Sequence, residues 1–399
     1  MSRIERGLVV DGYSDRWLRK GFPWVYPKEV VRGSRQAGKQ VEIRNAAGEL
    51  LGRGIADEGW LAARVFRHDG GPLDSTWLNQ TLDIALRLRE VVVPDATTAY
   101  RLVNAENDGL PGIRIDRWAT RFVISLDSPA VAVLMPGVVE WLCTRFSPRS
   151  VHLCYRADSR DTIDLSRAEP PSGRLWGDDD GTVEVLERGM KIRVYPSEGP
   201  DVGMYADMRE ARTWLSTRWA GKRVLNTFSY TGAFSVAAAI GGASEVVTCD
   251  LSEKVLLRAQ DNFQINGLEI DPEAFIADDT FKTLDRFRRK GRTFDVVVLD
   301  PPSFSHGPAG TWSAVKDYPR LVSAAARVLD ADGWLVVACN SGELSPNKFR
   351  GEVEEGVRRA DRRSQEIWRG SQGPDFPAAD WFPEGRYLKV GVWRVLSPA

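Results

Sequence analysis

The second half of the chain alternates strongly apolar runs with longer amphipathic stretches. The apolar runs are KRVLNTFSY, EVVTCDLS, FDVVVLDPP and GWLVVACNS, and segments with helical spacing lie between them. Near-continuous apolar runs are typical of strands that are buried on both faces of a parallel sheet. After about residue 200, the pattern therefore predicts a parallel, doubly wound α/β sheet, which binds ligands at the carboxyl ends of its strands.

The first half has a different pattern. Residues 28–66 contain short alternating stretches broken by glycines, which predict a small β-barrel or an open antiparallel sheet. STWLNQTLDIALRLREVV then has helical spacing, and YRLVN, GIRIDRW and RFVISL predict strands around the turn ENDGLPG. We predict three domains, a small β domain (1–75), a central α+β domain with a β-hairpin (76–195) and the α/β domain (196–399).

Composition narrows the class of protein. Hydrophobic residues make up 43% and charged residues 27% of the 399 residues, which is typical of a soluble globular protein. The N-terminus is charged where a signal peptide needs an apolar core, and we find no run long enough to span a membrane. The four cysteines form no CxxC pair and there are only three histidines, so we expect a reducing cytoplasm and no metal site.

The net charge of −1 gives no general sign of nucleic-acid binding, but the N-terminus is locally basic. Residues 1–40 hold nine Lys and Arg against four acids, with Trp17, Phe22, Trp24 and Tyr26 among them. Cations bind phosphates and aromatic rings stack on unpaired bases, so this mixture suits RNA. A solvated basic face over a small core is the alternative. The RNA-binding candidates are Arg16, Arg19, Lys20 and Trp24.

The first strand of the α/β domain leads into a candidate cofactor loop. Asn226 ends the strand, Gly232 opens a helix of small residues, and Asp250 ends the next strand, where a carboxylate can accept both hydroxyls of a ribose. Neither a GxGxxG fingerprint nor a phosphate loop is present, which favours S-adenosylmethionine (SAM) over a dinucleotide. The predicted cofactor residues here are Asn226, Phe228, Ser229, Tyr230, Thr231, Gly232, Asp250, Leu251, Asp278 and Asp279.

The fourth apolar run ends in Asp300-Pro301-Pro302, at the edge where ligands bind. Proline removes backbone donors and stiffens the loop, so this rim can orient a planar base beside a methyl donor. Because any strand must end at Pro-Pro, a simple strand terminator is the alternative. We expect Asp300 to contact both cofactor and substrate, and Pro301, Pro302 and Phe304 to contact the substrate.

Cys339 follows the apolar run GWLVVA, at the same predicted edge. A thiolate that adds to C6 of a pyrimidine makes C5 nucleophilic enough to take a methyl group. An inert core cysteine is the alternative, and Cys249, inside VVTCDLS, fits that description. Candidates for the base that removes the C5 proton are Asp300 and Glu384.

Several of these motifs resemble one family along essentially the whole chain. NTFSYTGAFS, CDLS, DNFQING, LDPPSFS and RYLKV are similar to class I methyltransferases related to ribosomal RNA large subunit methyltransferase I. RWLRKGFPWVYPKEV resembles the PUA domain of that family, and ACNSGEL also resembles the nucleophile loop of C5-uridine RNA methyltransferases. The resemblance implies a Rossmann-like domain, a PUA-like barrel and a 5-methylcytidine product in 23S rRNA.

The segment GMYADMREAR resembles the part of the family that closes over the adenosyl ligand. This implies that Tyr205, Asp207 and Arg209 contact the cofactor. Where the family usually has Gln-Lys-Thr-Gly, this chain has Pro200-Asp201-Val202, and the acid changes the charge beside the methyl donor.

We therefore predict a SAM-dependent RNA methyltransferase that forms 5-methylcytidine in large-subunit ribosomal RNA through Cys339. The alternatives are methylation of uridine C5 or of a guanine nitrogen, and a non-catalytic ribosome-assembly factor. The sequence leaves open whether the chain forms a homodimer.

Overall fold

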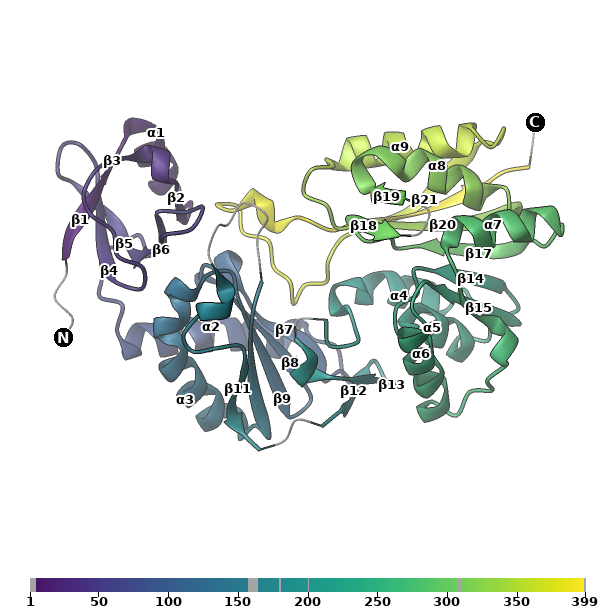
Figure 1. Ribbon diagram of the computed structural model, residues 1–399, viewed down its shortest axis with the longest axis horizontal. Helices are drawn as coiled ribbons and strands as arrows, with labels where there is room; N and C mark the ends of the chain where they lie inside the picture. The colour runs from purple at the N-terminus through teal and green to yellow at the C-terminus, as the bar shows by residue number, and fades with distance from the viewer. Residues whose placement is uncertain (1–4, 157–163, 179–180, 200, 308–309, 398–399) are drawn as a thin grey trace. The chain divides into compact units, whose positions relative to one another are not determined.

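The computed structural model describes residues 5–156, 164–178, 181–199, 201–307 and 310–397 (Figure 1). Its contacts divide the chain into two compact units. Unit 1 comprises Met1–Val185, Val194–Val202 and Pro374–Gly385, and unit 2 comprises Leu186–Arg193, Gly203–Gly373 and Arg386–Ala399. The predicted boundary at residue 75 falls inside unit 1, so the division into three domains stays a prediction.

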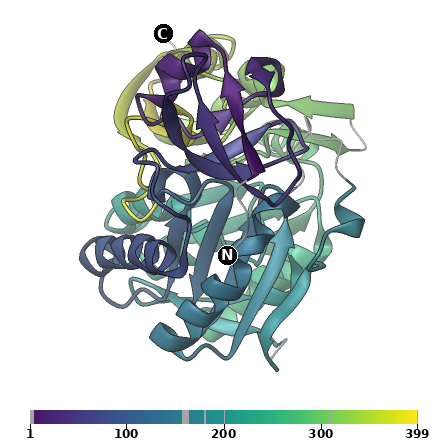
Figure 2. The ribbon, with the colours of Figure 1, turned by 90° about the vertical axis from the view of Figure 1, so that its left-hand side faces the viewer.

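Unit 1 begins with a six-stranded sheet in the order β2-β6-β5-β4-β1-β3, drawn in purple in Figure 2. Its strands are β1 (Glu5–Val10), β2 (Trp24–Val25), β3 (Val30–Arg32), β4 (Gln40–Arg44), β5 (Leu50–Ala56) and β6 (Ala63–Arg67). Gly54 lets β5 and β6 approach, because a Cβ there would lie 2.2 Å from the Arg64 carbonyl oxygen. Helix α1 (Gly12–Leu18) is capped by Asp11, which accepts from the Ser14 N–H at 2.8 Å. The predicted small β-sheet is thus present in this region, although β1 and β4 pair parallel and not antiparallel.

The rest of unit 1 is a five-stranded sheet in the order β11-β10-β9-β8-β7 with two helices. The elements are α2 (Ser75–Val92), β7 (Ala99–Asn104), β8 (Ile113–Trp118), β9 (Arg121–Leu126), α3 (Met135–Phe146), β10 (Ser150–Tyr155) and β11 (Gly173–Gly177). The helical segment Pro129–Phe146 is long and apolar enough to cross a membrane by length and composition. Its residues Val131, Val138 and Trp141 are buried in the core of this unit, as expected of a core helix.

Unit 2 is built on a seven-stranded sheet in the order β16-β15-β14-β17-β20-β22-β21. The strands are β14 (Arg223–Thr227), β15 (Glu245–Asp250), β16 (Phe275–Ala277), β17 (Phe294–Leu299), β20 (Leu329–Cys339), β21 (Ser364–Gly370) and β22 (Lys389–Val395). The predicted parallel sheet is correct for the first five strands in this order. It is wrong for β22 and β21, because β22 inserts antiparallel between β20 and the edge strand β21.

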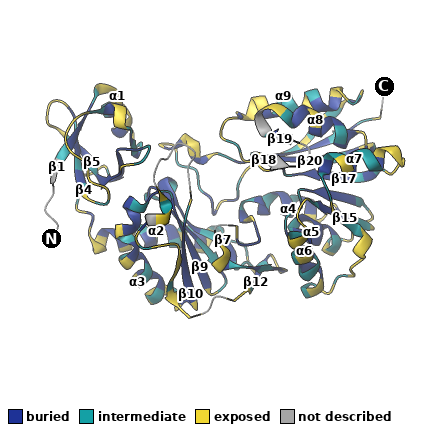
Figure 3. Ribbon diagram, viewed as in Figure 1, coloured by how far each residue is buried: buried dark blue, intermediate teal, exposed yellow. Residues whose placement is uncertain are grey.

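Helices cover both faces of this sheet, as a doubly wound fold requires (Figure 1). On one face lie α4 (Arg209–Ser216), α5 (Ala233–Ile240) and α6 (Glu253–Ile265), and on the other lie α7 (Thr280–Arg289), α8 (Ala314–Ala326) and α9 (Pro346–Arg358). Strand residues alternate between two core clusters, and Figure 3 shows the central strands almost entirely buried. For example, Val336 and Ala338 pack toward α4 and α5, whereas Val337 and Cys339 pack toward α8 and α9.

Two further antiparallel pairs are small. The strands β18 (Phe304–Gly307) and β19 (Gly310–Ser313) follow the Asp300-Pro301-Pro302 turn, and β12 (Val183–Glu187) pairs with β13 (Met190–Val194). Trp312 of β19 is buried, and its indole N–H donates to the Pro302 carbonyl oxygen at 2.7 Å. The β18–β19 pair thus holds the proline turn in place.

Candidate functional site

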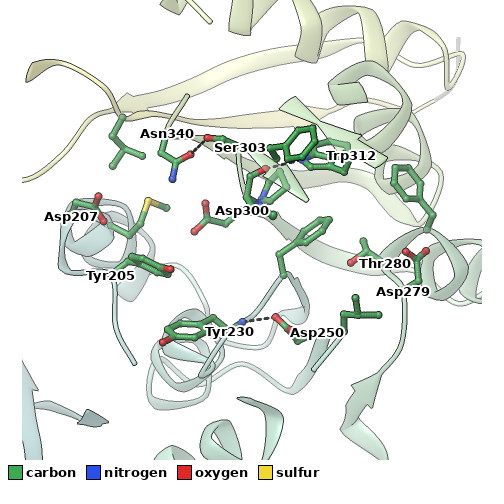
Figure 4. A pocket seen from close by; sticks show the side chains of 18 of the residues that line it. Tyr205, Asp207, Tyr230, Asp250, Asp279, Thr280, Asp300, Ser303, Trp312 and Asn340 are labelled. Carbon is green, nitrogen blue, oxygen red and sulfur yellow. Dashed lines mark hydrogen bonds between the residues drawn. The ribbon is translucent and has the colours of Figure 1, made fainter. Parts of the chain in front are cut away.

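A cavity of about 620 Å³ lies in unit 2 at the carboxyl ends of the parallel strands (Figure 4). Its walls form two halves that come from different strands. The β14–β16 half consists of Phe228, Tyr230, Asp250, Leu251, Asp279, Thr280 and Phe281. The β17–β20 half consists of Asp300, Pro301, Pro302, Ser303, Phe304 and Asn340. Further lining residues are Tyr205, Asp207, Met208, Trp312, Arg320 and Leu388.

The β14–β16 half is shaped by a tightly constrained backbone loop. Phe228 and Tyr230 have left-handed φ angles of 53° and 50°, which are unfavourable for aromatic residues. Hydrogen bonds hold the loop in this form, from the Ser229 N–H to the Cys249 carbonyl oxygen (3.0 Å) and from the Tyr230 N–H to Asp250 Oδ2 (2.9 Å). Such strain, held in place by neighbouring contacts, is characteristic of ligand-binding loops.

Asp250 ends β15 at the cavity wall, as predicted from the sequence. Besides the Tyr230 N–H, it accepts the Ser252 N–H on Oδ1 at 3.1 Å. Burial raises the pKa of its carboxyl group, while these two backbone donors oppose the rise. A carboxylate has about four acceptor positions, so Asp250 keeps capacity for the two hydroxyls of a ribose.

The other predicted cofactor residues divide into three groups. Asn226, Ser229 and Thr231 line a smaller cavity of about 60 Å³ that shares Tyr230 and Asp300 with the large one. Gly232 lines neither cavity. A larger residue would not fit at this position, because the backbone has a φ of 78° and an added Cβ would lie 2.9 Å from the Ala259 Cβ. Two further predicted residues, Arg209 and Asp278, also lie outside both cavities. Arg209 is buried, with its Nε 3.7 Å from Glu187 Oε2, and Asp278 forms an ion pair with Arg286 at 3.5 Å.

Asp300 is the titratable group of the β17–β20 half. It is half-buried at the cavity wall, and Figure 4 shows its carboxyl group pointing into the cavity. Burial and the nearby Asp207 raise the pKa of Asp300 to about 7, and Arg212 opposes them. A carboxyl group with this pKa changes charge near neutral pH, which is typical of residues that act on a substrate.

Tyr205 and Asp207, which the resemblance implied, also lie at this cavity, near Tyr230. The Tyr205 and Tyr230 rings lie 5.3 Å apart, and Tyr387 donates from its hydroxyl to Asp207 Oδ2 at 2.7 Å. Tyr205 is 46% exposed, so its ring forms part of the open wall. Tyr205 and Asp207 both line the cavity, and their contact with the cofactor stays a prediction.

Cys339 ends β20, next to the strand that carries Asp300, as the sequence predicted. Its side chain, however, is 1% exposed and lies in the core cluster with Val337. The Tyr318 hydroxyl donates to the Ala338 carbonyl oxygen at 2.5 Å and contacts the thiol. Asn340, the next residue, is exposed and lines the cavity instead. This follows from strand geometry, because neighbouring side chains point to opposite sides.

The remaining predicted site residues belong to unit 1. Glu384 is exposed in the turn Pro383–Gly385, so its role as a base stays a prediction. On α1 and the residues after it, Lys20 lies over the Trp17 ring (5.1 Å) and Arg16 over the Tyr13 ring (5.8 Å). The other two RNA-binding candidates make internal contacts, since Arg19 pairs with Asp15 (2.7 Å) and Trp24 donates to Glu106 (2.9 Å).

Sequence reasoning missed several cavity residues. They are Met208, Thr280, Phe281, Ser303, Trp312, Arg320, Asn340 and Leu388. Arg320 comes from the middle of α8 and lies 4.1 Å from the centre of the Phe281 ring, a contact that no local motif announces. For Asn340 and Ser303 a signal was present, because both directly follow motifs that had been singled out.

The cavity fits a cofactor without a pyrophosphate group. Its size is suitable for a ligand as large as SAM, and Asp250 presents acceptors beside the strained loop. At the other half, Asp300 presents a carboxyl group that a neighbouring cation would stabilise in its charged form. The carboxyl groups of Asp250 and Asp300 are thus compatible with an adenosyl ligand that carries a sulfonium.

Comparison with family models gives two matches. Residues 155–388 match the S-adenosylmethionine-dependent methyltransferase model, and residues 9–68 match a PUA-like domain. The chain is similar to proteins named ribosomal RNA large subunit methyltransferase I. The Klebsiella pneumoniae protein is 31% identical, with 98% of both chains covered, and that of Aliivibrio fischeri is 33% identical, with 96% of this chain and 97% of the other covered.

Solved structures show the same fold. The structure of SMU.776 complexed with SAH has a TM-score of 0.86 at 23% identity, covering 98% of this chain and 100% of that chain. A SAM-dependent methyltransferase from Streptococcus mutans has a TM-score of 0.84 with the same identity and coverage. The predicted fold class, a Rossmann-like methyltransferase domain preceded by a PUA-like domain, is confirmed. The chain belongs to the SAM-dependent methyltransferases and, within them, to the ribosomal RNA large subunit methyltransferase I family.

Proposed function

We propose that this protein methylates a base of large-subunit ribosomal RNA, with SAM in the β14–β16 half of the cavity and the base in the β17–β20 half. The observation that carries the proposal is the pairing in one cavity of Asp250, suited to a ribose, with Asp300. The relatives, 31–33% identical over nearly their whole length, are named for this RNA. Bound SAM would supply an electrophilic methyl group.

The residues of the chain would then bind and orient. Asp250 would accept the ribose hydroxyls, and Asp300 would take up or hold a proton near the acceptor atom. Pro301 and Pro302, fixed by Trp312, would give the base a rigid edge to lie against. The target base must leave its stack to enter such a cavity.

Unit 1 would bind the RNA strand. On α1, Tyr13 is 54% exposed and Trp17 is 40% exposed, and each ring lies under a cation. Exposed rings with cations suit unpaired nucleotides. Location in the cytoplasm, where a soluble enzyme would meet ribosomal RNA, stays a prediction.

The acceptor atom has two candidates. The sequence predicts C5 of cytosine, with Cys339 adding to C6, and the resemblance supports this product. The reaction would require the thiol to leave the core cluster, where it is 1% exposed, and to enter the cavity. Residues 339–342 would have to rearrange, although Lys389 holds this segment by donating to the Ser341 carbonyl oxygen at 2.5 Å.

The second candidate is a base nitrogen, and a specific observation favours it. Among the described residues that line the cavity there is no cysteine, and Asn340 lies where a strand-end nucleophile was predicted. A base nitrogen with a lone pair, such as guanine N1 after deprotonation, attacks a methyl group without a covalent intermediate. Asp300, with a pKa of about 7, is suited to accept the proton. On this geometry we favour nitrogen.

Methylation of unmodified ribosomal RNA with labelled SAM, followed by nucleoside mass spectrometry, tests whether the protein methylates this RNA and which atom receives the methyl group. We expect a methylated base from the wild-type protein. A 5-methylcytidine product, together with a covalent adduct to 5-fluorocytidine RNA that is lost in Cys339→Ala, would establish the carbon reaction. An N-methylated guanine without an adduct would establish the nitrogen reaction. SAM binding without any RNA methylation would contradict the proposed function and favour an assembly factor.

A further inference from the structure

Asn340 and Ser303 form a pair at the β17–β20 half that neither the motifs nor the comparisons assign. The two residues follow β20 and β17, which are parallel neighbours in the sheet. The Ser303 hydroxyl donates to Asn340 Oδ1 at 2.6 Å, and both residues line the cavity. Figure 4 shows the Asn340 amide nitrogen directed into the cavity, on the side of Asp300.

The short distance decides which way the amide faces. Hydrogen bonds of 2.6 Å are normal between two oxygens, whereas N–H donors lie at about 2.7–3.2 Å from oxygen. The Asn340 oxygen therefore faces Ser303, and its two N–H donors face the cavity. Among the described residues, none accepts a hydrogen bond from Asn340 Nδ2, so these donors are available to a ligand.

The surroundings make these donors distinctive. Pro301 and Pro302 have no N–H, and the Ser303 hydroxyl is committed to Asn340. The other polar groups of this end of the cavity are the carboxyl groups of Asp207 and Asp300. Above a pH of about 7, Asp300 is mainly a hydrogen-bond acceptor. Asn340 thus complements the two acids by supplying neutral donors.

We propose that Asn340, oriented by Ser303, donates a hydrogen bond to a carbonyl oxygen of the target base. This inference rests on the proposed function and restricts its substrate. Cytosine, uracil and guanine each have a carbonyl oxygen that can accept from these donors, whereas adenine offers only ring nitrogens as acceptors. The β17–β20 half is therefore suited to a base that presents a carbonyl oxygen to Asn340. Ser303 acts as a positioning residue, and Asn340 binds the substrate.

Three variants test the proposal, with full-length protein, labelled SAM and unmodified ribosomal RNA. Asn340→Asp keeps the shape and the Ser303 contact but replaces the donors by an acceptor, so kcat/KM for RNA should fall on the order of 100-fold. Asn340→Ala removes the donors without repulsion and should cost about 10-fold. Ser303→Ala allows the Asn340 amide to rotate and should lower kcat/KM about 3-fold, mainly through kcat. SAM affinity should be unchanged in all three variants.

Asn347→Asp, on the exposed start of α9, is the matched control and should leave kcat/KM and SAM affinity unchanged. Thermal unfolding of each variant shows whether the fold is intact. Equal kcat/KM in wild type and Asn340→Asp would overturn the inference, as would a parallel loss of SAM affinity, which would place Asn340 on the cofactor. If the wild-type protein methylates no RNA, the proposed function itself fails. Methylation of an adenine by the wild type would contradict the carbonyl requirement alone.

Discussion

The two halves of the cavity are built in different ways. The β14–β16 half is formed by backbone, with two left-handed residues tied to the tip of the next strand through the Tyr230 N–H and Asp250. The β17–β20 half is formed by side chains. Asp300, Ser303 and Asn340 line the cavity because their side chains, at or just after the ends of β17 and β20, point into it. The first half depends on a loop conformation, and the second depends on strand alternation.

This difference determines how each half tolerates change. A backbone loop is held by several bonds at once, so its shape persists when one outer side chain varies. Side chains at a strand end exchange places with the core when the register changes by one residue. Cys339 and Asn340 illustrate this, since one lies in the core and its neighbour lines the cavity. Binding of the cofactor is thus expected to tolerate changes in outer side chains but not the loss of a residue that holds the loop, such as Asp250. Specificity for the base is expected to be sensitive to each side chain at the strand ends.

The largest expected effect is that of Asp300→Asn in the β17–β20 half. The amide cannot take up a proton, so we expect kcat for RNA methylation to fall by about 10²–10³-fold with SAM affinity reduced far less. In the wild type, kcat/KM should rise with pH through a midpoint at or below 7, because the ionised form accepts the proton and a bound sulfonium favours ionisation. Rates between pH 5.5 and 9 check the loss in Asp300→Asn and the pH profile, and a wild-type profile that rises nowhere in this range would contradict the role of Asp300.

The same substitution has a consequence for stability. The pKa of Asp300 is about 7 in the folded protein, above the ordinary 3.8, so the folded state holds a proton that the unfolded state has released. Between pH 4 and 7, this group therefore lowers stability as pH rises. Asp300→Asn should be about as stable as wild type near pH 4 and more stable at pH 8, by at most about 4 kcal/mol and by less in so far as solvent screens this half-buried group. Melting curves of both proteins at the two pH values measure this difference in stability. A difference between variant and wild type that becomes smaller at higher pH would contradict the raised pKa of Asp300.

In the β14–β16 half, Asp250→Ala should weaken SAM binding by about 100-fold. It removes the acceptor for the ribose and leaves the Tyr230 N–H without its partner, so the strained loop relaxes. Calorimetry with SAM measures the affinity. Asp285→Ala, on the surface of α7, is the control, because its carboxylate pairs only with Arg288 and Arg289 at high exposure in the described contacts. Unchanged SAM binding by Asp250→Ala would refute the assignment of the cofactor to this half.

Most of the lining of the β14–β16 half, though not Thr280 and Phe281, could be located from the sequence because its residue types carry the information. In a doubly wound fold, an acid at the end of a strand that is followed by a helix, such as Asp250, lies at the edge of the sheet where ligands bind. For the other half, the sequence placed Asp300 and Cys339 at the correct edge but did not decide which side chain of the Cys339-Asn340 pair enters the cavity. That depends on the register of β20 between β17 and the antiparallel β22, and the sequence had predicted a parallel sheet throughout.

Cys339→Ala tests this point with a smaller effect. For a thiol buried in the core we expect a loss of about 1–2 kcal/mol of stability, with RNA methylation within twofold of wild type. Cys249→Ala is the matched control, since Cys249 is also fully buried at the end of a parallel strand. If the two variants behave alike in melting and in activity, Cys339 is a core residue. A folded Cys339→Ala that has lost methylation, beside an active Cys249→Ala, would restore the covalent reaction at C5.

The smallest expected effects separate the two halves through one phenylalanine in each. Phe304 is 56% exposed at the β17–β20 half, whereas Phe281 lies at the β14–β16 half with Arg320 over its ring. Leucine keeps the apolar surface and removes only the stacking face, so each change should cost about 3–10-fold. Phe304→Leu should raise KM for RNA and leave SAM affinity intact, and Phe281→Leu should do the reverse. Steady-state kinetics and calorimetry on both variants give the four values, and if either variant impairs RNA and SAM equally, the division of the cavity into a base half and a cofactor half is wrong.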